Sequence, residues 1–223
     1  MVNRIRDDAA QYLASKVCQG RFMPFDLRDV YVEALVCCAL RDAFPDAGWK
    51  PAENGAPWDL EDDNYTYLQV KQASALSQIP GSECSERARP LFFDIHPGKL
   101  GRQTHLYVFA WHPEGNPDIA DHRDAGQWRF CVMPEDELPE PAVQQKTQRI
   151  SLGRLQVLAK RLGLQPTIPY RELAITINHF ASVILEADLK DARQAEEALE
   201  RIQRGEERTY SSQEVMAKLG LGS

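Results

Sequence analysis

The chain has 223 residues, 43% of them hydrophobic and 26% charged, with a formal net charge of −7. This length predicts one main domain with at most a small appendage. No apolar run approaches the roughly 20 residues that a transmembrane helix needs, so we expect no membrane span. The first residues lack the apolar core of a signal peptide, and five cysteines without C-x-x-C spacing favour neither disulfides nor a zinc site. We therefore expect a cytoplasmic protein.

The net charge argues against nucleic acid as a partner, because phosphate binding rests mainly on Lys and Arg. The charges are unevenly distributed, however, and residues 141–171 contain six basic side chains and no acidic one. A basic surface on a helix there would contact a DNA backbone, and an ordinary solvated helix face is the equally weighted alternative. The candidate DNA contacts are Arg149, Arg154, Lys160 and Arg161.

The predicted elements begin with helices over residues 3–17 and 26–44. The second has Asp26 as its N-cap and stops at Pro45. Most of its positions are apolar, so it should be buried on more than one side. Glu33 is the only charged residue between positions 30 and 40 of this helix.

After Gly48 the pattern changes to strands. Three short consecutive strands, separated by turn-forming Asn, Gly, Pro and Asp, are predicted over residues 48–54, 56–62 and 64–74. Further strands are predicted over 91–95, 105–111 and 128–133. The chain then becomes helical, with a basic helical segment over 144–163 and helices over 170–184 and 188–205, the last capped by Asp188.

The end of the chain predicts one more short helix. Ser211 and Glu214 have the spacing of a capping box, and Gly220 closes the last turn. The order of helix, strands and helices predicts an α/β fold with a mixed central β-sheet flanked by helices and a C-terminal helical extension. We place the main domain at residues 1–185 and the helical tail at 186–223.

The strand over 64–74 carries the residues of chemical interest. Because strand side chains alternate faces, Gln69 and Lys71 project to the same side, with Tyr65 and Tyr67. Asp59 lies ten residues before Gln69 in the preceding predicted strand, so a hairpin would bring its carboxylate opposite them. A carboxylate, an amide oxygen and an ammonium would then converge.

Hydrolysis of a phosphodiester needs these chemical groups. Mg²⁺ or Mn²⁺ takes oxygen ligands, polarises a phosphoryl oxygen and lowers the pKa of an attacking water. Asp59 and the side-chain oxygen of Gln69 would hold the cation, with the Val70 carbonyl as a backbone ligand. The Lys71 ammonium would assist the water and offset charge in the transition state. The alternative is that Gln69 and Lys71 only form an exposed strand face and that Asp59 is a turn residue.

The sequences P57-W-D59 and Q69-V-K71 resemble the PD-(D/E)XK nuclease superfamily, in the variant with Gln in the middle position, as in its Mrr-like and very-short-patch-type branches. The resemblance covers residues 26–74 and implies a restriction endonuclease-like core and a magnesium-dependent endonuclease that cuts DNA, in restriction or defence. It also implies that Glu33, on the helix before the sheet, adds a ligand to the metal; a structural ion pair is the alternative for this residue. Cleavage of both strands would require a homodimer, since one such site cuts one strand.

Residues 198–221 resemble the toxin-wrapping tails of RelB- and Phd-type antitoxins. The resemblance implies a protein partner for this segment, and an ordinary C-terminal helical hairpin is the alternative. The rival function is therefore a non-catalytic protein that binds DNA or a partner in a toxin-antitoxin or regulatory system.

Overall fold

The structure is a computed structural model that describes residues 21–76, 91–95, 104–139, 148–206 and 208–218. The helix predicted over 3–17 lies outside these ranges. The chain divides into two compact units, Met1–Ala181 and Ser182–Ser223, and each is described by itself. Among the described helices, none is long and apolar enough to cross a membrane.

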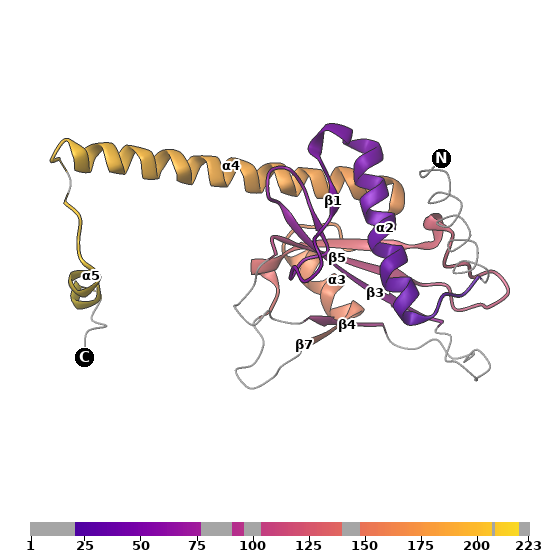
Figure 1. Cartoon of the computed structure of the whole chain (residues 1–223). Helices are drawn as coiled ribbons and strands as arrows, with labels where there is room; N and C mark the ends of the chain where they lie inside the picture. The colour runs from indigo at the N-terminus through magenta and orange to yellow at the C-terminus, as the bar shows by residue number, and fades with distance from the viewer. Residues whose placement is uncertain (1–20, 77–90, 96–103, 140–147, 207, 219–223) are drawn as a thin grey trace, which may run out of the picture. The chain divides into compact units, whose positions relative to one another are not determined.

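A six-stranded sheet forms the centre of the first unit and has the strand order β1-β2-β3-β5-β6-β8. Its strands β1, β3 and β5 are labelled in Figure 1. Only the pair β3–β5 is parallel, so the sheet is mixed, as predicted. Its strands are β1 (Lys50–Pro51), β2 (Leu60–Glu61), β3 (Tyr67–Ser74), β5 (Leu106–His112), β6 (Arg129–Pro134) and β8 (Ile168–Pro169). A separate antiparallel pair consists of β4 (Phe92–Ile95) and β7 (Gln148–Ser151).

Helix α2 (Phe25–Ala43) covers one face of the sheet, where the buried Arg28 donates a hydrogen bond to Gln72 of β3. The opposite face packs against the β4–β7 pair and α3 (Leu152–Arg161), which lie together in Figure 1. This second core includes Phe93, Phe109, Trp111, Met133, Ile150 and Leu155. Successive side chains of β5 point to opposite faces of the sheet and all are buried, so the strand contributes to a core on each face. Short 3₁₀ turns occupy Pro45–Ala47, Ala125–Gln127 and Glu135–Glu137.

A tight turn closes the β2–β3 hairpin. The Asp62 carboxylate accepts hydrogen bonds from the backbone N–H groups of Asn64 (3.0 Å) and Thr66 (2.7 Å). Tyr65 between them adopts a positive φ of 62°, which is uncommon for a bulky residue. The prediction that Tyr65 lies in the strand beside Gln69 is therefore wrong: the Asx turn holds it outside β3.

Other predicted boundaries also need correction. The first two predicted strands shrink to two residues each, and Asp59 lies in a bend before β2. Helix α2 begins at Phe25, after Pro24 as N-cap, so Asp26 is not its cap and lies in the first turn, where its charge suits the helix dipole. The described part of the predicted helix over 144–163 begins as strand β7.

The predicted break before Asp188 is absent. Helix α4 (Tyr170–Gln203) runs continuously across it, because the residues around Leu185 include neither Gly nor Pro and nothing stops the helix. Gly205, with φ 74°, follows its end, and the N–H of Glu206 donates to the Arg201 carbonyl at 2.9 Å. The predicted domain boundary between residues 185 and 186 falls within this helix.

Helix α5 (Ser212–Lys218) begins with the predicted capping box. The Glu214 carboxylate accepts the Ser211 N–H at 2.8 Å, and the Ser211 hydroxyl accepts the Glu214 N–H at 3.3 Å. This reciprocal pair is therefore confirmed. The expected closing residue Gly220 lies outside the described residues.

Gly48 gives a test of the turn that leads into β1. Its φ is +70°, and a Cβ atom there would lie 2.1 Å from Cγ of Asp63. We expect Gly48→Ala to lower the free energy of unfolding by about 2 kcal/mol, because it combines backbone strain with this clash. Urea titration in an Asp63→Ala background should recover the clash contribution and leave a loss of about 1 kcal/mol from the backbone. Equal losses in both backgrounds would contradict the role of Asp63.

Candidate active site

Asp59 lies at the edge of β3. Its N–H donates to the Leu68 carbonyl at 2.8 Å, and its carbonyl accepts the Ala52 N–H at 2.9 Å. One carboxylate oxygen, Oδ2, accepts two hydrogen bonds, from Gln69 Nε2 at 2.7 Å and from the Val70 N–H at 2.6 Å. The predicted hairpin thus brings Asp59 and Gln69 into direct contact.

The edge of β3 explains this contact. Strand β2 pairs only with Tyr67 and Leu68, so it offers no carbonyl to the Val70 N–H. The Asp59 carboxylate accepts this N–H instead. In a strand, the N–H and C=O of one residue point to the same side, so the Val70 carbonyl also points to this edge. That is the direction required of the predicted backbone ligand.

The Gln69 amide presents its nitrogen to Asp59, which directs its oxygen elsewhere. A cation shared by both residues would require the amide to turn over, because only the oxygen can bind a cation. The two ends of an amide have almost the same shape, so this turn mainly costs the hydrogen bond to Asp59.

Glu33 faces the same region from α2 and is half-buried. Burial, with the negative charges of Asp59 and Asp29, raises its pKa to about 7, and the ammonium of Lys71 opposes the rise. Lys71 is half-buried too, and among the residues that the structure describes it forms no ion pair. Two carboxylates that repel each other are the environment that a cation would relieve.

A pocket of about 450 Å³ adjoins this edge, between α2 and the β4–β7 pair. Glu33, Val70 and Lys71 line it, but Asp59 and Gln69 do not. Among the described residues there is no cluster of three or more His, Cys, Asp or Glu side chains that could hold a metal ion. A cation here would therefore depend on amide and backbone oxygens as well as on carboxylates.

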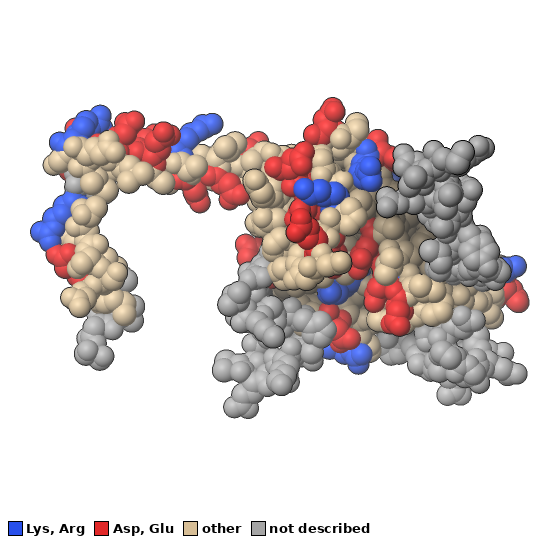
Figure 2. Space-filling model, viewed as in Figure 1, with Lys and Arg blue, Asp and Glu red and all other residues tan. Residues whose placement is uncertain are grey.

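The four predicted DNA contacts fall in two places. Arg149 lies on β7 at the pocket, where it pairs with Asp94 at 3.1 Å and its guanidinium lies 5.4 Å from the Phe92 ring centroid. Arg154 and Arg161 of α3 line a second hollow of about 230 Å³, and Lys160 is exposed on the same helix. On the face that Figure 2 shows, basic and acidic side chains are interspersed among the described residues.

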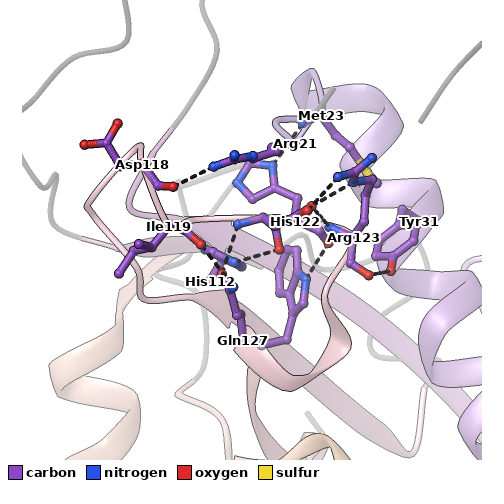
Figure 3. A network of polar contacts seen from close by, with 11 residues as sticks. Arg21, Met23, Tyr31, His112, Asp118, Ile119, His122, Arg123 and Gln127 are labelled. Carbon is purple, nitrogen blue, oxygen red and sulfur yellow. Dashed lines mark hydrogen bonds and ion pairs between the residues drawn. The ribbon is translucent and has the colours of Figure 1, made fainter. Parts of the chain in front are cut away.

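A buried polar network, which the sequence did not reveal, lies at the end of β3 and β5 (Figure 3). His112 and His122 are both fully buried, with ring centroids 4.9 Å apart. The Trp128 indole N–H donates to the His122 carbonyl at 2.9 Å. Ser74, which also lines the pocket, lies 3.0 Å from His122 Nε2. A serine beside a histidine is a candidate nucleophile.

The hydrogen bonds argue against that role. His122 Nδ1 accepts the backbone N–H of Met23 at 3.0 Å, so in the neutral ring the proton is on Nε2. Nε2 then donates to Ser74, whose hydroxyl donates to the Leu76 carbonyl at 2.6 Å. His122 therefore has no lone pair directed at the serine, and the group serves to connect β3 with the segments around Met23 and His122.

His122 predicts how acid affects stability. Burial, with the nearby charge of Arg28, lowers its pKa to about 3, so the folded state resists a proton that the unfolded chain binds below about pH 6.5. The stability that the neutral His122 ring contributes is fully present above pH 6.5 and is lost as the pH falls towards 3. We expect the His122→Asn variant to be less stable than the wild type at pH 7.5. Between pH 7.5 and 5.0 its free energy of unfolding should fall less steeply than that of the wild type, and the two slopes should differ by up to about 1.4 kcal/mol per pH unit.

Urea unfolding at a series of pH values measures this slope. The matched control is His179→Asn, at an exposed position of α4, which should keep the wild-type slope. Identical slopes for His122→Asn and the wild type would contradict the assignment of a buried neutral ring.

Comparisons with known proteins identify no family for this chain. No protein-family model, no curated protein and no solved structure matches it. Its chemistry is therefore inferred from its own residues and their geometry.

Proposed function

We propose that this protein is a Mg²⁺- or Mn²⁺-dependent endonuclease that hydrolyses phosphodiester bonds of DNA, with a restriction endonuclease-like core of the PD-(D/E)XK type. The observation that carries the proposal is the contact of the Asp59 carboxylate with Gln69 and the Val70 N–H at the edge of β3. Both contacts place the Asp59 carboxylate beside the strand that carries Gln69 and Lys71, as a metal site at this edge would require.

The surrounding elements support the proposal. Helix α2, the three antiparallel strands β1 to β3 and the next sheet strand β5, parallel to β3, follow in the order expected for such a core. Glu33 extends from that helix towards the same edge, where its pKa responds to Asp59 and Lys71. The oxygen-rich set of Asp59, Glu33, Gln69 and the Val70 carbonyl suits a hard divalent cation.

Each residue then has a distinct role. Asp59, Glu33, the Gln69 oxygen and the Val70 carbonyl would hold the cation, which supplies Lewis-acid polarisation of the phosphate and a lower pKa for water. Lys71 would place its ammonium beside the scissile phosphate, where a fixed positive charge stabilises the developing negative charge. Arg149, which lines the pocket, would contact the phosphate backbone of the DNA strand.

A non-catalytic binding protein of a toxin-antitoxin or regulatory system is the second candidate. One observation favours it: in the unit Ser182–Ser223, large apolar side chains are exposed at Leu189, Leu199, Val215 and Met216. A helix that keeps such residues in water is a candidate for binding a protein partner. In that case residues 198–221 would carry the function and the edge of β3 would not cut DNA.

Plasmid nicking distinguishes the two candidates. We expect the purified protein to nick supercoiled DNA with Mg²⁺ or Mn²⁺ and to lose this activity in EDTA. Lys71→Ala should reduce the rate about a hundredfold or more, because it removes charge stabilisation of the transition state, and Asp59→Asn should have a similar effect through the cation. Circular dichroism and urea unfolding would show that both variants fold.

Lys190→Ala is the matched control, since it removes the same charge at an exposed position of α4 that does not line the pocket. It should cut at the wild-type rate. Absence of cutting with either metal, together with a small protein that co-purifies and is lost on deletion of residues 198–221, would instead support the second candidate.

A further inference from the structure

The second half of helix α4 carries an apolar stripe. In the unit Ser182–Ser223, apolar side chains recur along the helix at three- and four-residue intervals and therefore lie on one face. This α4 stripe consists of Leu185, Leu189, Ala192, Ala195, Leu199 and Ile202. Leu189 and Leu199 are 48% and 59% exposed. Helices in proteins owe most of their stability to the packing of such a face, so we expect the stripe to pack against another surface.

Acidic side chains give the α4 stripe a negative charge. Asp188 lies four residues before Ala192, and Glu196 lies four residues after it, so both carboxylates project from the stripe. Lys190 and Arg204 project from the opposite side of the helix. A surface that covers the stripe must therefore offer cations as well as apolar side chains, because a carboxylate that is covered without a cation loses its hydration.

Helix α3 has an exposed surface of that kind. Its Arg154, Leu158 and Arg161 follow one another at four- and three-residue intervals, so they lie on one face. The second hollow, of about 230 Å³, is lined by Arg154, Val157, Leu158 and Arg161, together with Glu137 and Pro139. Val157 is 68% exposed. Within the described ranges neither arginine forms an ion pair. Two unpaired cations thus flank an apolar hollow.

The charges on the two helices have similar spacing. The arginines of α3 are seven residues apart, about 10 Å along the helix axis, and the acids of the α4 stripe are eight residues apart, about 12 Å. Ala192 and Ala195 lie between those acids, and their small side chains leave room for Val157 when two helices pack closely. The two surfaces are therefore complementary in charge and in apolar character.

We propose that α4 of one copy of this protein binds α3 of a second copy, with Asp188 and Glu196 on the two arginines and the apolar side chains of the stripe against Val157 and Leu158. In a two-fold symmetric pair this contact forms twice, once in each direction. Arg154 and Arg161, which the sequence predicted as DNA contacts, would then bind protein instead.

Two joined copies have a use in the proposed function, and for that use the inference rests on it. One active site cuts one strand, so cleavage of both strands of DNA needs two sites. The contact itself rests only on the charges and the exposed apolar side chains of the two helices.

Analytical ultracentrifugation of the full chain tests the contact. We expect the wild type to be a dimer whose dissociation constant rises with salt, because screening weakens the ion pairs. Arg154→Glu with Arg161→Glu, and separately Asp188→Lys with Glu196→Lys, should each raise the dissociation constant about a hundredfold or more, since like charges then meet. All four positions are exposed, so both double variants should fold, which circular dichroism checks.

A mixture of the two double variants is the decisive measurement. The lysines of one variant then face the glutamates of the other, and the second contact of the pair is the native one, so dimers should form again with near wild-type affinity. Lys190→Glu with Arg204→Glu is the matched control, because it reverses two charges on the opposite side of α4, and it should stay dimeric. A mixture that stays monomeric overturns the proposal. Should a double variant fail to fold, Val157→Glu decides alone, and a dimer of that variant with wild-type affinity overturns the proposal.

The remaining outcomes separate the two proposals. A monomeric wild type that nicks plasmid DNA refutes the pairing and leaves the nuclease. A monomeric wild type that co-purifies with a different small protein refutes the pairing and supports the second candidate function. A dimer that responds to the charge variants as expected but cuts no DNA with either metal refutes the nuclease and leaves the pairing.

Discussion

The hydrogen bonds of the Asp59 carboxylate to the edge of β3 are the contact on which the proposed site depends. Strand β2 ends after pairing two residues of β3, so the backbone beyond Leu68 needs other partners. One oxygen of the carboxylate accepts hydrogen bonds from both the Val70 N–H and the Gln69 amide. A longer β2 would have covered this edge with backbone and left no place for a side chain. The short strand is therefore what opens the edge towards α2 and the pocket.

The sequence predicted the features that follow from local patterns. Alternation placed Gln69 and Lys71 on one side of β3, and turn-forming residues located the β2–β3 hairpin, so the contact of Asp59 with Gln69 could be anticipated. The capping box of Ser211 and Glu214 was equally readable, because it depends on two side chains three residues apart.

Features that depend on distant residues were not predictable. Ser74 and His122 are 48 positions apart, and no spacing rule connects them. The orientation of the Gln72 amide depends on Arg28, 44 positions away on another element. The prediction of Asp188 as a cap rests on the preference of Asp for N-caps and is wrong, because an exposed Asp within a helix costs little when no residue nearby breaks the helix. In each case, contacts with residues far away in the sequence, or the helix around the residue, determine its structure more than its own local preference does.

Glutamine at position 69 has a physical consequence that an acid there would not have. A Glu side chain would add a third negative charge beside Asp59 and Glu33, whose pKa is already raised to about 7, and without a cation these groups would repel one another. The Gln69 amide instead donates a hydrogen bond to Asp59 and holds the carboxylate in place. The amide must then give up this hydrogen bond to offer its oxygen, and it contributes no charge. The proposed site would therefore bind a cation more weakly than a site with two acids at these positions.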